Sequence, residues 1–148
     1  RDTCARPYRV MRQVLYAAYS LRVHQGGQLE REGGMEAFDE ALFKRYGAGA
    51  DCAERLYAHF PHLLSYGAGY ASYLWARVWS EDLIAHLGLI HGDAQAIAPF
   101  VQSVLRRERP RSFTQALEGV LGRPMSLDAF SRWVSGEGHG APPVRAEG

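Results

Sequence analysis

Residues 70–87 read YASYLWARVWSEDLIAHL, and this stretch decides the fold class. Its apolar positions recur at helical spacing, at Leu74, Val78, Leu83, Ile84 and Leu87. Gly88 follows at once, and glycine commonly ends a helix. The first half is apolar almost all round, with the exception of Arg77. We therefore expect one long helix over 70–87 whose first half is buried at the centre of the domain.

The same spacing continues on the N-terminal side of this helix. Residues 8–24 place apolar side chains three and four positions apart, at Val10, Val14, Ala17, Ala18 and Leu21. This pattern predicts a helix that docks by that face. After a glycine-rich loop at 26–34, a second helix should end at Gly47. Its apolar stripe consists of Met35, Phe38, Leu42 and Phe43.

Capping signals mark further helices on the C-terminal side. Asp93 can cap a helix that runs toward Arg107, with Pro99 in its first turns or at a bend. Ser112 and Gln115 have the spacing of a capping box for the next helix.

Ser126 precedes a last helix in the same way as Ser112. No run of alternating β-branched residues appears, so the predicted fold class is all-α, an irregular helical domain over residues 1–135. Residues 136–148 have too little apolar surface to offset the entropy of ordering, and we expect a disordered tail.

Composition excludes several classes of protein. The chain has 148 residues, 47% hydrophobic and 22% charged, which fits a single soluble domain. Its net charge of +1 gives no field that would attract nucleic acid, and a solvated helix end explains the basic cluster at 106–111. Cys4 and Cys52 form no metal or redox motif, so we expect reduced thiols in an intracellular protein. No apolar run approaches the roughly 18 residues that span a bilayer, so no membrane partner is expected.

The N-terminal segment allows two interpretations. The chain begins with Arg1 and has no methionine before Met11, which suggests a processed or partial chain. Residues 1–23 hold five arginines and one acid, a balance that also suits a mitochondrial transit peptide. The helical spacing over 8–24 favours the docked helix.

Chemistry is suggested by the tyrosines of residues 59–75, because a buried phenol needs a hydrogen-bond partner. Tyr70 and Tyr73 leave the same face of a helix, and Tyr66 precedes them across Gly67 and Gly69. Since glycines have no side chain, this loop can approach another backbone closely. Phenols stay protonated at neutral pH and can donate to a peptide backbone or an oxyanion. The alternative is that they are packing aromatics with hydroxyls at the surface.

The sequence contains no HExxH, GxGxxG, P-loop or GxSxG motif. His59 and His62 lie three positions apart but are separated by Phe60 and Pro61, and the nearest carboxylate is that of Glu54. We therefore expect no metal ligands in this chain, and a hydrogen-bonding role for His62.

Two segments carry a resemblance to a known family. HFPHLLSYGAGYASYLWARVWSEDLI at 59–84 is followed by VLGRPMSLDAF at 120–130. Together they resemble the carboxy-terminal part of the thimet oligopeptidase and mitochondrial intermediate peptidase family of zinc metallopeptidases. The similarity covers roughly residues 8–135. The spacing from His62 to Tyr66 is closer to the mitochondrial intermediate peptidase branch.

The resemblance implies a largely helical, two-lobed enzyme in which zinc, held by an HExxH helix and a downstream Glu, hydrolyses oligopeptides or presequences. Zn2+ is the implied cofactor of the full-length enzyme, and the implied partners are a peptide substrate and the remainder of the catalytic domain. The implied location is the mitochondrial matrix, with the cytoplasm as the alternative. The implied site residues are Tyr70 and Tyr73 as catalytic donors, His62 and Tyr66 as substrate-binding residues, and Gly67 and Gly69 as the glycines that let the loop close.

Three departures from the family pattern limit what the resemblance implies. Ala71 replaces a tyrosine, RRERPRS at 106–112 replaces a glycine-rich turn, and the zinc motif is missing. The chain is then either a C-terminal fragment, prone to association, or a degenerate relative. Two further hypotheses stay open, a non-catalytic helical peptide-binding module and a helical scaffold whose aromatics only fill its core.

Overall fold

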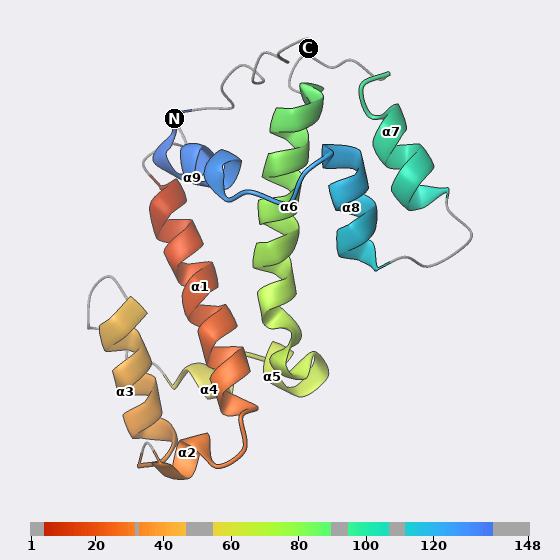
Figure 1. Cartoon of the computed structure of the whole chain (residues 1–148). Helices are drawn as coiled ribbons and strands as arrows, with labels where there is room; N and C mark the ends of the chain where they lie inside the picture. Colours follow the sequence, from red (N-terminus) through yellow and green to blue (C-terminus); the bar gives the residue numbers. More distant parts are fainter. Residues whose placement is uncertain (1–4, 32, 47–54, 90–94, 107–111, 138–148) are drawn as a thin grey trace. The chain divides into compact units, whose positions relative to one another are not determined.

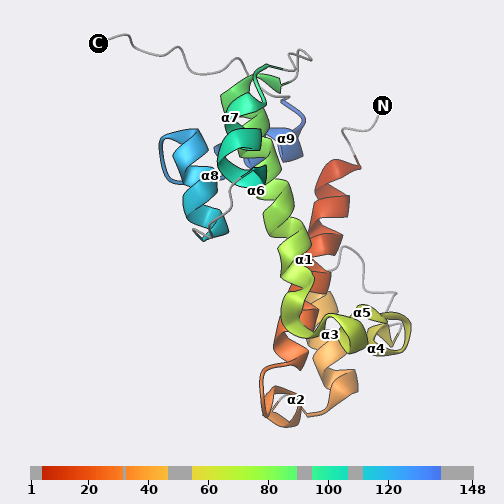
Figure 2. The same cartoon turned by 90° about the vertical axis from the view of Figure 1, so that its right-hand side faces the viewer.

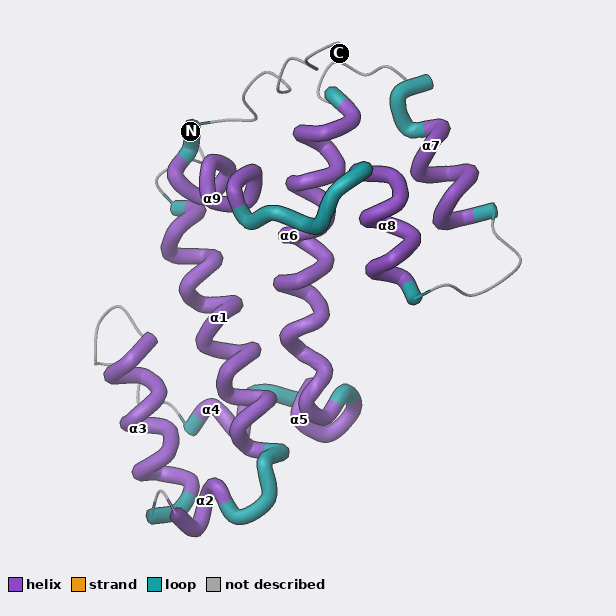
Figure 3. Tube along the Cα trace, in the orientation of Figure 1, coloured by secondary structure: helices purple, strands orange, loops and turns teal. Residues whose placement is uncertain are grey.

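The computed structural model describes residues 5–31, 33–46, 55–89, 95–106 and 112–137. All regular secondary structure in these ranges is helical, as Figure 3 shows, so the all-α fold class is confirmed for this part of the chain. The chain divides into two compact units, Arg1–Ala76 and Arg77–Gly148. The predictions made for Cys4, Cys52, Asp93 and residues 138–148 lie outside the described ranges.

The first unit is built around one long helix. Its elements are α1 (Arg6–Val23), α2 (Gln28–Arg31), α3 (Met35–Tyr46), α4 (Leu56–His59), α5 (His62–Ser65), the 3-10 turn η1 (Gly67–Tyr70) and the start of α6 (Ala71–Leu87). Figures 1 and 2 show α3 beside α1, with α4 and α5 near the C-terminal part of α1. The helices predicted over 8–24 and from Met35 are confirmed, and α2 interrupts the predicted loop.

The core of the first unit lies on a face of α1 that the apolar spacing did not select. Its fully packed members are Leu15, Tyr19, Phe38, Leu42 and Phe60. Of the predicted docking face, only Ala17 is buried, and Leu21 is 47% exposed. The predicted face included neither Leu15 nor Tyr19, and Tyr19 carries a polar hydroxyl. That hydroxyl donates to Asp39 Oδ1 over 2.5 Å, which allows the ring to be fully buried.

Asp39 joins three helices of the first unit. Besides the Tyr19 hydroxyl of α1, it accepts from the backbone N–H of Leu56 at the start of α4 over 3.2 Å. Burial raises the pKa of the Asp39 carboxyl, while the two hydrogen bonds act in the opposite direction. Burial, followed by the bond to Asp39, also raises the pKa of Tyr19. The pair therefore holds α1, α3 and α4 together by satisfied polar contacts inside the core.

The extent of α6 agrees with its prediction, but its burial does not. The helix ends at Leu87, and Gly88 follows in the left-handed conformation with φ +65°. The expectation that its first half is buried was wrong, because Trp75 is 52% exposed and Tyr73 is 47% exposed. Its buried residues begin only at Val78, the last residue of the first half, and continue in the second half at Glu81, Asp82, Leu83 and Ala85. Apolar composition gives a helix the capacity for burial, whereas burial itself requires a packing partner.

The second unit packs short helices on the second half of α6. They are α7 (Ala98–Phe100), the π-helical turn η3 (Val101–Leu105), α8 (Phe113–Leu121) and α9 (Asp128–Ser135). Leu83, Leu117 and Leu121 form its core, with Phe100 and Val104 packed against them. Pro99 lies in the first turn of α7, one of the two places predicted for it. None of the helices in the described ranges combines the length and apolar character that a membrane span requires.

One of the two predicted serine caps is present in the second unit. The Ser112 side chain accepts from Gln115 N over 3.2 Å and caps α8. At α9 the N-cap is Leu127, and Ser126, one residue earlier, accepts from Asp128 N over 3.1 Å. The segment between these helices is held by Asp82. This buried carboxylate accepts two bonds from Arg123, of 2.6 and 2.9 Å, and one from Ser126 N over 2.9 Å.

A cation lies between an aromatic ring and a carboxylate in the same unit. The Arg77 guanidinium is 4.0 Å from the centroid of the Trp133 ring and pairs with Glu81 over 2.5 Å. The Glu81 side chain is fully buried. Pairing with Arg77 compensates for part of the cost of burying that carboxylate.

Candidate functional site

Four side chains proposed as site residues from the sequence lie together in the first unit. His62 begins α5, Tyr66 lies between α5 and η1, Tyr70 ends η1, and Tyr73 lies in the first turn of α6. We call His62, Tyr66, Tyr70 and Tyr73 the tyrosine cluster. The His62 ring is at its centre, with ring centroids 5.6 Å from Tyr66, 5.3 Å from Tyr70 and 6.3 Å from Tyr73.

Two consecutive tight turns bring these rings together. Tyr66 N donates to His62 O over 2.9 Å and closes α5, and Gly69 N donates to Tyr66 O over 2.9 Å and begins η1. Gly67, between the two turns, has a φ of +52°, which an L side chain rarely adopts. The chain therefore reverses over a few residues and stacks the His62 ring on Tyr66 with an interplanar angle of 27°.

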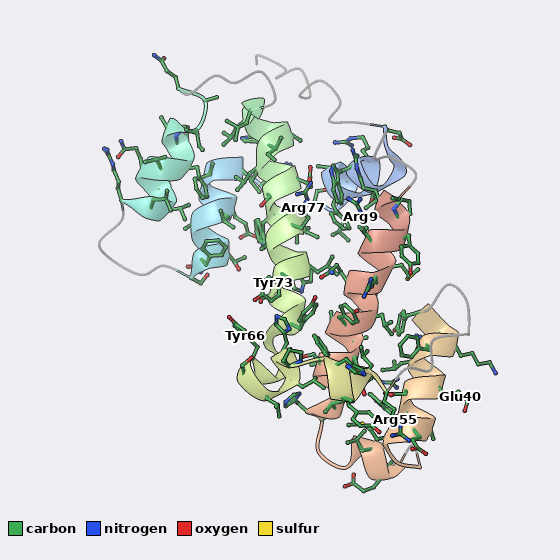
Figure 4. All side chains as sticks on the ribbon, turned by 180° about the vertical axis from the view of Figure 1, so that it is seen from behind. Arg9, Glu40, Arg55, Tyr66, Tyr73 and Arg77 are labelled. Atoms are coloured by element: carbon green, nitrogen blue, oxygen red, sulfur yellow. The ribbon has the colours of Figure 1, made fainter. Side chains whose placement is uncertain are left out.

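The cluster has an exposed side and a packed side. Tyr66 is 59% exposed and Tyr73 is 47% exposed, and Figure 4 shows both projecting from the same side of this part of the chain. Their ring centroids are 6.3 Å apart. Tyr70 is half-buried and packs against the core of the first unit, where Phe60 lies 5.0 Å from it. Packing therefore accounts for the position of Tyr70 but not for the exposed rings of Tyr66 and Tyr73.

The environment raises the pKa of two of these phenols, Tyr70 and Tyr73. Burial raises the pKa of Tyr70, and the hydrogen bond to Gln13 acts in the opposite direction. Hydrogen bonding with Tyr66 is the main cause that raises the pKa of Tyr73. Because free phenols already titrate near pKa ~10, both hydroxyls carry a proton at neutral pH.

Side chains of helix α1 hold the turn in place through hydrogen bonds. Ser20 Oγ donates to Gly67 O over 2.6 Å, and the Tyr70 hydroxyl donates to Gln13 Oε1 over 3.0 Å. The His24 ring bonds Ser20 O through Nδ1 over 2.8 Å and lies against Gly67. Gln13, Ser20 and His24 were not predicted as site residues. Their spacing of seven and then four residues places them on one helical face, which was the available signal.

The two site glycines differ in what their positions require. A Cβ on Gly67 would lie 3.7 Å from His24 Nε2, and the backbone there is left-handed. Gly69 has an ordinary φ, and a Cβ built on it meets nothing within 4 Å. Conformation therefore demands glycine at Gly67 and not at Gly69. The closing movement assigned to both glycines stays a prediction.

The described residues do not by themselves fit a zinc ion. No group of three or more His, Cys, Asp or Glu side chains is placed to hold a metal within these ranges. His59 is exposed and lies outside the tyrosine cluster. The chemistry that these residues can supply is contact with aromatic rings and hydrogen-bond donation.

Comparisons with known protein families, with characterised proteins and with solved structures find no match to this chain. A functional assignment therefore depends on the sequence motifs and on the geometry of the tyrosine cluster.

Proposed function

We propose that this chain supplies the substrate-binding wall of a zinc metalloendopeptidase of the thimet oligopeptidase type, acting on oligopeptides or presequences. The observation that carries the proposal is the tyrosine cluster, in which two exposed phenols and one half-buried phenol surround His62. The peptidase family named in this proposal is inferred from the motif resemblance of residues 59–84. A location in the mitochondrial matrix belongs to the same proposal.

The spacing of the exposed rings suits an extended peptide. The centroids of Tyr66 and Tyr73 are 6.3 Å apart. Two residues of an extended strand span about 6.7 Å, so the two rings can contact alternate residues of one peptide. Their hydroxyls can donate to backbone carbonyls of that peptide, which gives affinity without requiring a particular side chain.

The proposed catalytic contribution of this chain is hydrogen-bond donation by Tyr70 and Tyr73. Both are protonated at neutral pH, so each can donate to the substrate carbonyl as negative charge develops on its oxygen. His62 would form a hydrogen bond with the substrate backbone, and its ring would hold the three phenol rings in position around it. Zinc in the full-length enzyme would polarise the carbonyl and activate water, with its ligands on sequence outside this chain.

Peptide binding is the first test of the proposal. A fluorescein-labelled, unstructured, arginine-rich presequence peptide would be titrated into the full chain and followed by fluorescence anisotropy. We expect saturable binding that Tyr66→Phe and Tyr73→Phe each weaken by about fivefold, the value of one net hydrogen bond. Tyr8→Phe is the matched control, because Tyr8 is 56% exposed and lies outside the cluster. The proposal fails if the peptide does not bind, or if all three variants bind equally well.

Catalysis is tested in a protein that joins this chain to an HExxH helix. There, Tyr70→Phe and Tyr73→Phe should each lower turnover of a quenched peptide by about a hundredfold, the effect of losing one transition-state donor. Unchanged turnover would remove the catalytic role. Peptide binding that never leads to zinc-dependent hydrolysis would instead support the second candidate, a non-catalytic peptide-binding module, which the exposed rings of Tyr66 and Tyr73 serve equally well.

A further inference from the structure

The Tyr70 hydroxyl is already occupied in this structure. A phenol has one proton, and Tyr70 donates its proton to Gln13 Oε1 over 3.0 Å. In this arrangement Tyr70 can accept a hydrogen bond but cannot donate one to a bound peptide. Donation to a ligand requires that the hydroxyl proton turn away from Gln13.

The Tyr70 ring itself has little room to move its hydroxyl away from Gln13. Four rings surround it, with centroids at 5.0 Å for Phe60, 5.3 Å for His62 and Tyr73, and 5.7 Å for Tyr16. The backbone beneath it is fixed as well, because Gly67 at the start of η1 accepts from Ser20. The hydroxyl oxygen therefore stays beside Gln13 while its proton is redirected.

Gln13 has the chemistry to redirect this proton. Its amide carries an acceptor oxygen on one side and an NH2 donor on the other, and half a turn about the terminal bond exchanges them. With the NH2 group facing Tyr70, the phenol oxygen accepts from Gln13 and its proton is free for a ligand. Gln13 is half-buried on α1, within a face that already holds the turn through Ser20.

We propose that Gln13 is a positioning residue that sets the direction of the Tyr70 hydroxyl proton and so switches Tyr70 between a resting and a peptide-binding state. This inference rests on the proposed function, since it concerns how the same site binds peptide. Gln13 acts through Tyr70 and has no assigned contact with the peptide.

Two substitutions at Gln13 separate this role from simple support of the fold. Gln13→Glu places a carboxylate that only accepts, so it holds the Tyr70 proton and should weaken peptide binding by about tenfold. Gln13→Met has similar length and no strong acceptor, so the proton is released and binding should stay within about threefold of the unmodified chain or become tighter. A residue that only supports the turn would give the opposite order, because methionine removes the bond and glutamate keeps it.

A double-substitution cycle gives the decisive readout. Binding of the labelled presequence peptide is measured for Gln13→Glu, Tyr70→Phe and the combined variant, with circular dichroism to verify folding. If Gln13 acts through Tyr70, Gln13→Glu has no further effect once the hydroxyl is absent.

An undiminished tenfold effect in the Tyr70→Phe background would overturn the inference, and so would equal binding by Gln13→Glu and the unmodified chain. If Gln13→Glu does not fold, Gln13→Met still decides, since a loss beyond about threefold contradicts the inference. Failure of the unmodified chain to bind peptide would instead refute the proposed function itself.

Discussion

The hydroxyl of Ser20 donates to the carbonyl oxygen of Gly67 over 2.6 Å and joins α1 to the first residue of η1. These residues are 47 positions apart in the chain. Ser20 is almost completely buried, and its own carbonyl is bonded by the His24 ring. The turn that carries the tyrosine cluster is thus fixed at its base by the side chains of α1.

Removal of the Ser20 hydroxyl should loosen this turn. We expect Ser20→Ala to lower the free energy of unfolding by about 1–2 kcal/mol, because the Gly67 carbonyl loses its partner in a partly buried site. Urea denaturation followed by circular dichroism measures the change. Ser72→Ala is the control, since Ser72 is exposed at the start of α6. Equal stability of the two variants would mean that the turn does not depend on Ser20.

The two glycines of the turn should respond differently to alanine. Gly67→Ala forces a side chain into a left-handed backbone with φ +52°, so we expect a loss of about 1 kcal/mol or more. Gly69→Ala meets open space at an ordinary φ and should be neutral or stabilising by about 0.5 kcal/mol, because it restricts the unfolded chain. Thermal unfolding of both variants tests the contrast. Equal destabilisation would contradict the difference in backbone conformation.

The pair formed by Asp82 and Arg123 predicts an acid-sensitive second unit. Burial alone would raise the pKa of Asp82, but the bonds from Arg123 and from Ser126 N overcome it and hold the pKa below its usual value. A lowered carboxyl pKa stabilises the fold above the unfolded value of about 3.9, and this contribution is lost as the pH falls through the folded value. Trp79 and Trp133 lie in this unit, so their fluorescence in a Trp75→Phe chain should report unfolding below about pH 4.

Substitution of Arg123 tests the same pair at neutral pH. Among the described residues, Arg123→Met leaves the buried Asp82 with the Ser126 N–H as its hydrogen-bond donor. We expect a loss of about 2 kcal/mol, less than for a fully buried pair because Arg123 is partly exposed. Arg106→Met is the control in the same unit, since Arg106 is exposed. A variant that keeps full stability and the original acid transition would show that the pair contributes nothing.

Helix ends were the most predictable part of the fold. Ser112 accepts from Gln115 N, and Gly88 follows α6 in a left-handed conformation, both as expected from the sequence. These features are local, because a cap or a terminating glycine involves residues within a few positions of one another. Local spacing likewise predicted that Tyr70 and Tyr73 share a face, and their ring centroids are 5.3 Å apart.

Features that depend on distant partners could not be predicted in this way. Tyr19 is fully buried because Asp39, twenty residues away, accepts its hydroxyl proton. Gln13 lies beside Tyr70 although 57 positions separate them. Tyr73 and Trp75 in the first half of α6 are exposed despite its apolar composition, since no periodicity reveals whether a partner covers a face. Burial and support of the site are therefore properties of the tertiary structure.

Nitration of tyrosines in the presence of peptide tests the central claim most directly. Tetranitromethane would modify the full chain with and without saturating presequence peptide, and mass spectrometry would quantify nitration at each tyrosine. If the tyrosine cluster binds peptide, Tyr66 and Tyr73 are protected, while Tyr8, similarly exposed on α1, is modified to the same extent in both samples. Equal nitration of Tyr66 and Tyr73 with and without bound peptide would contradict the account, because the peptide would then lie elsewhere on the chain.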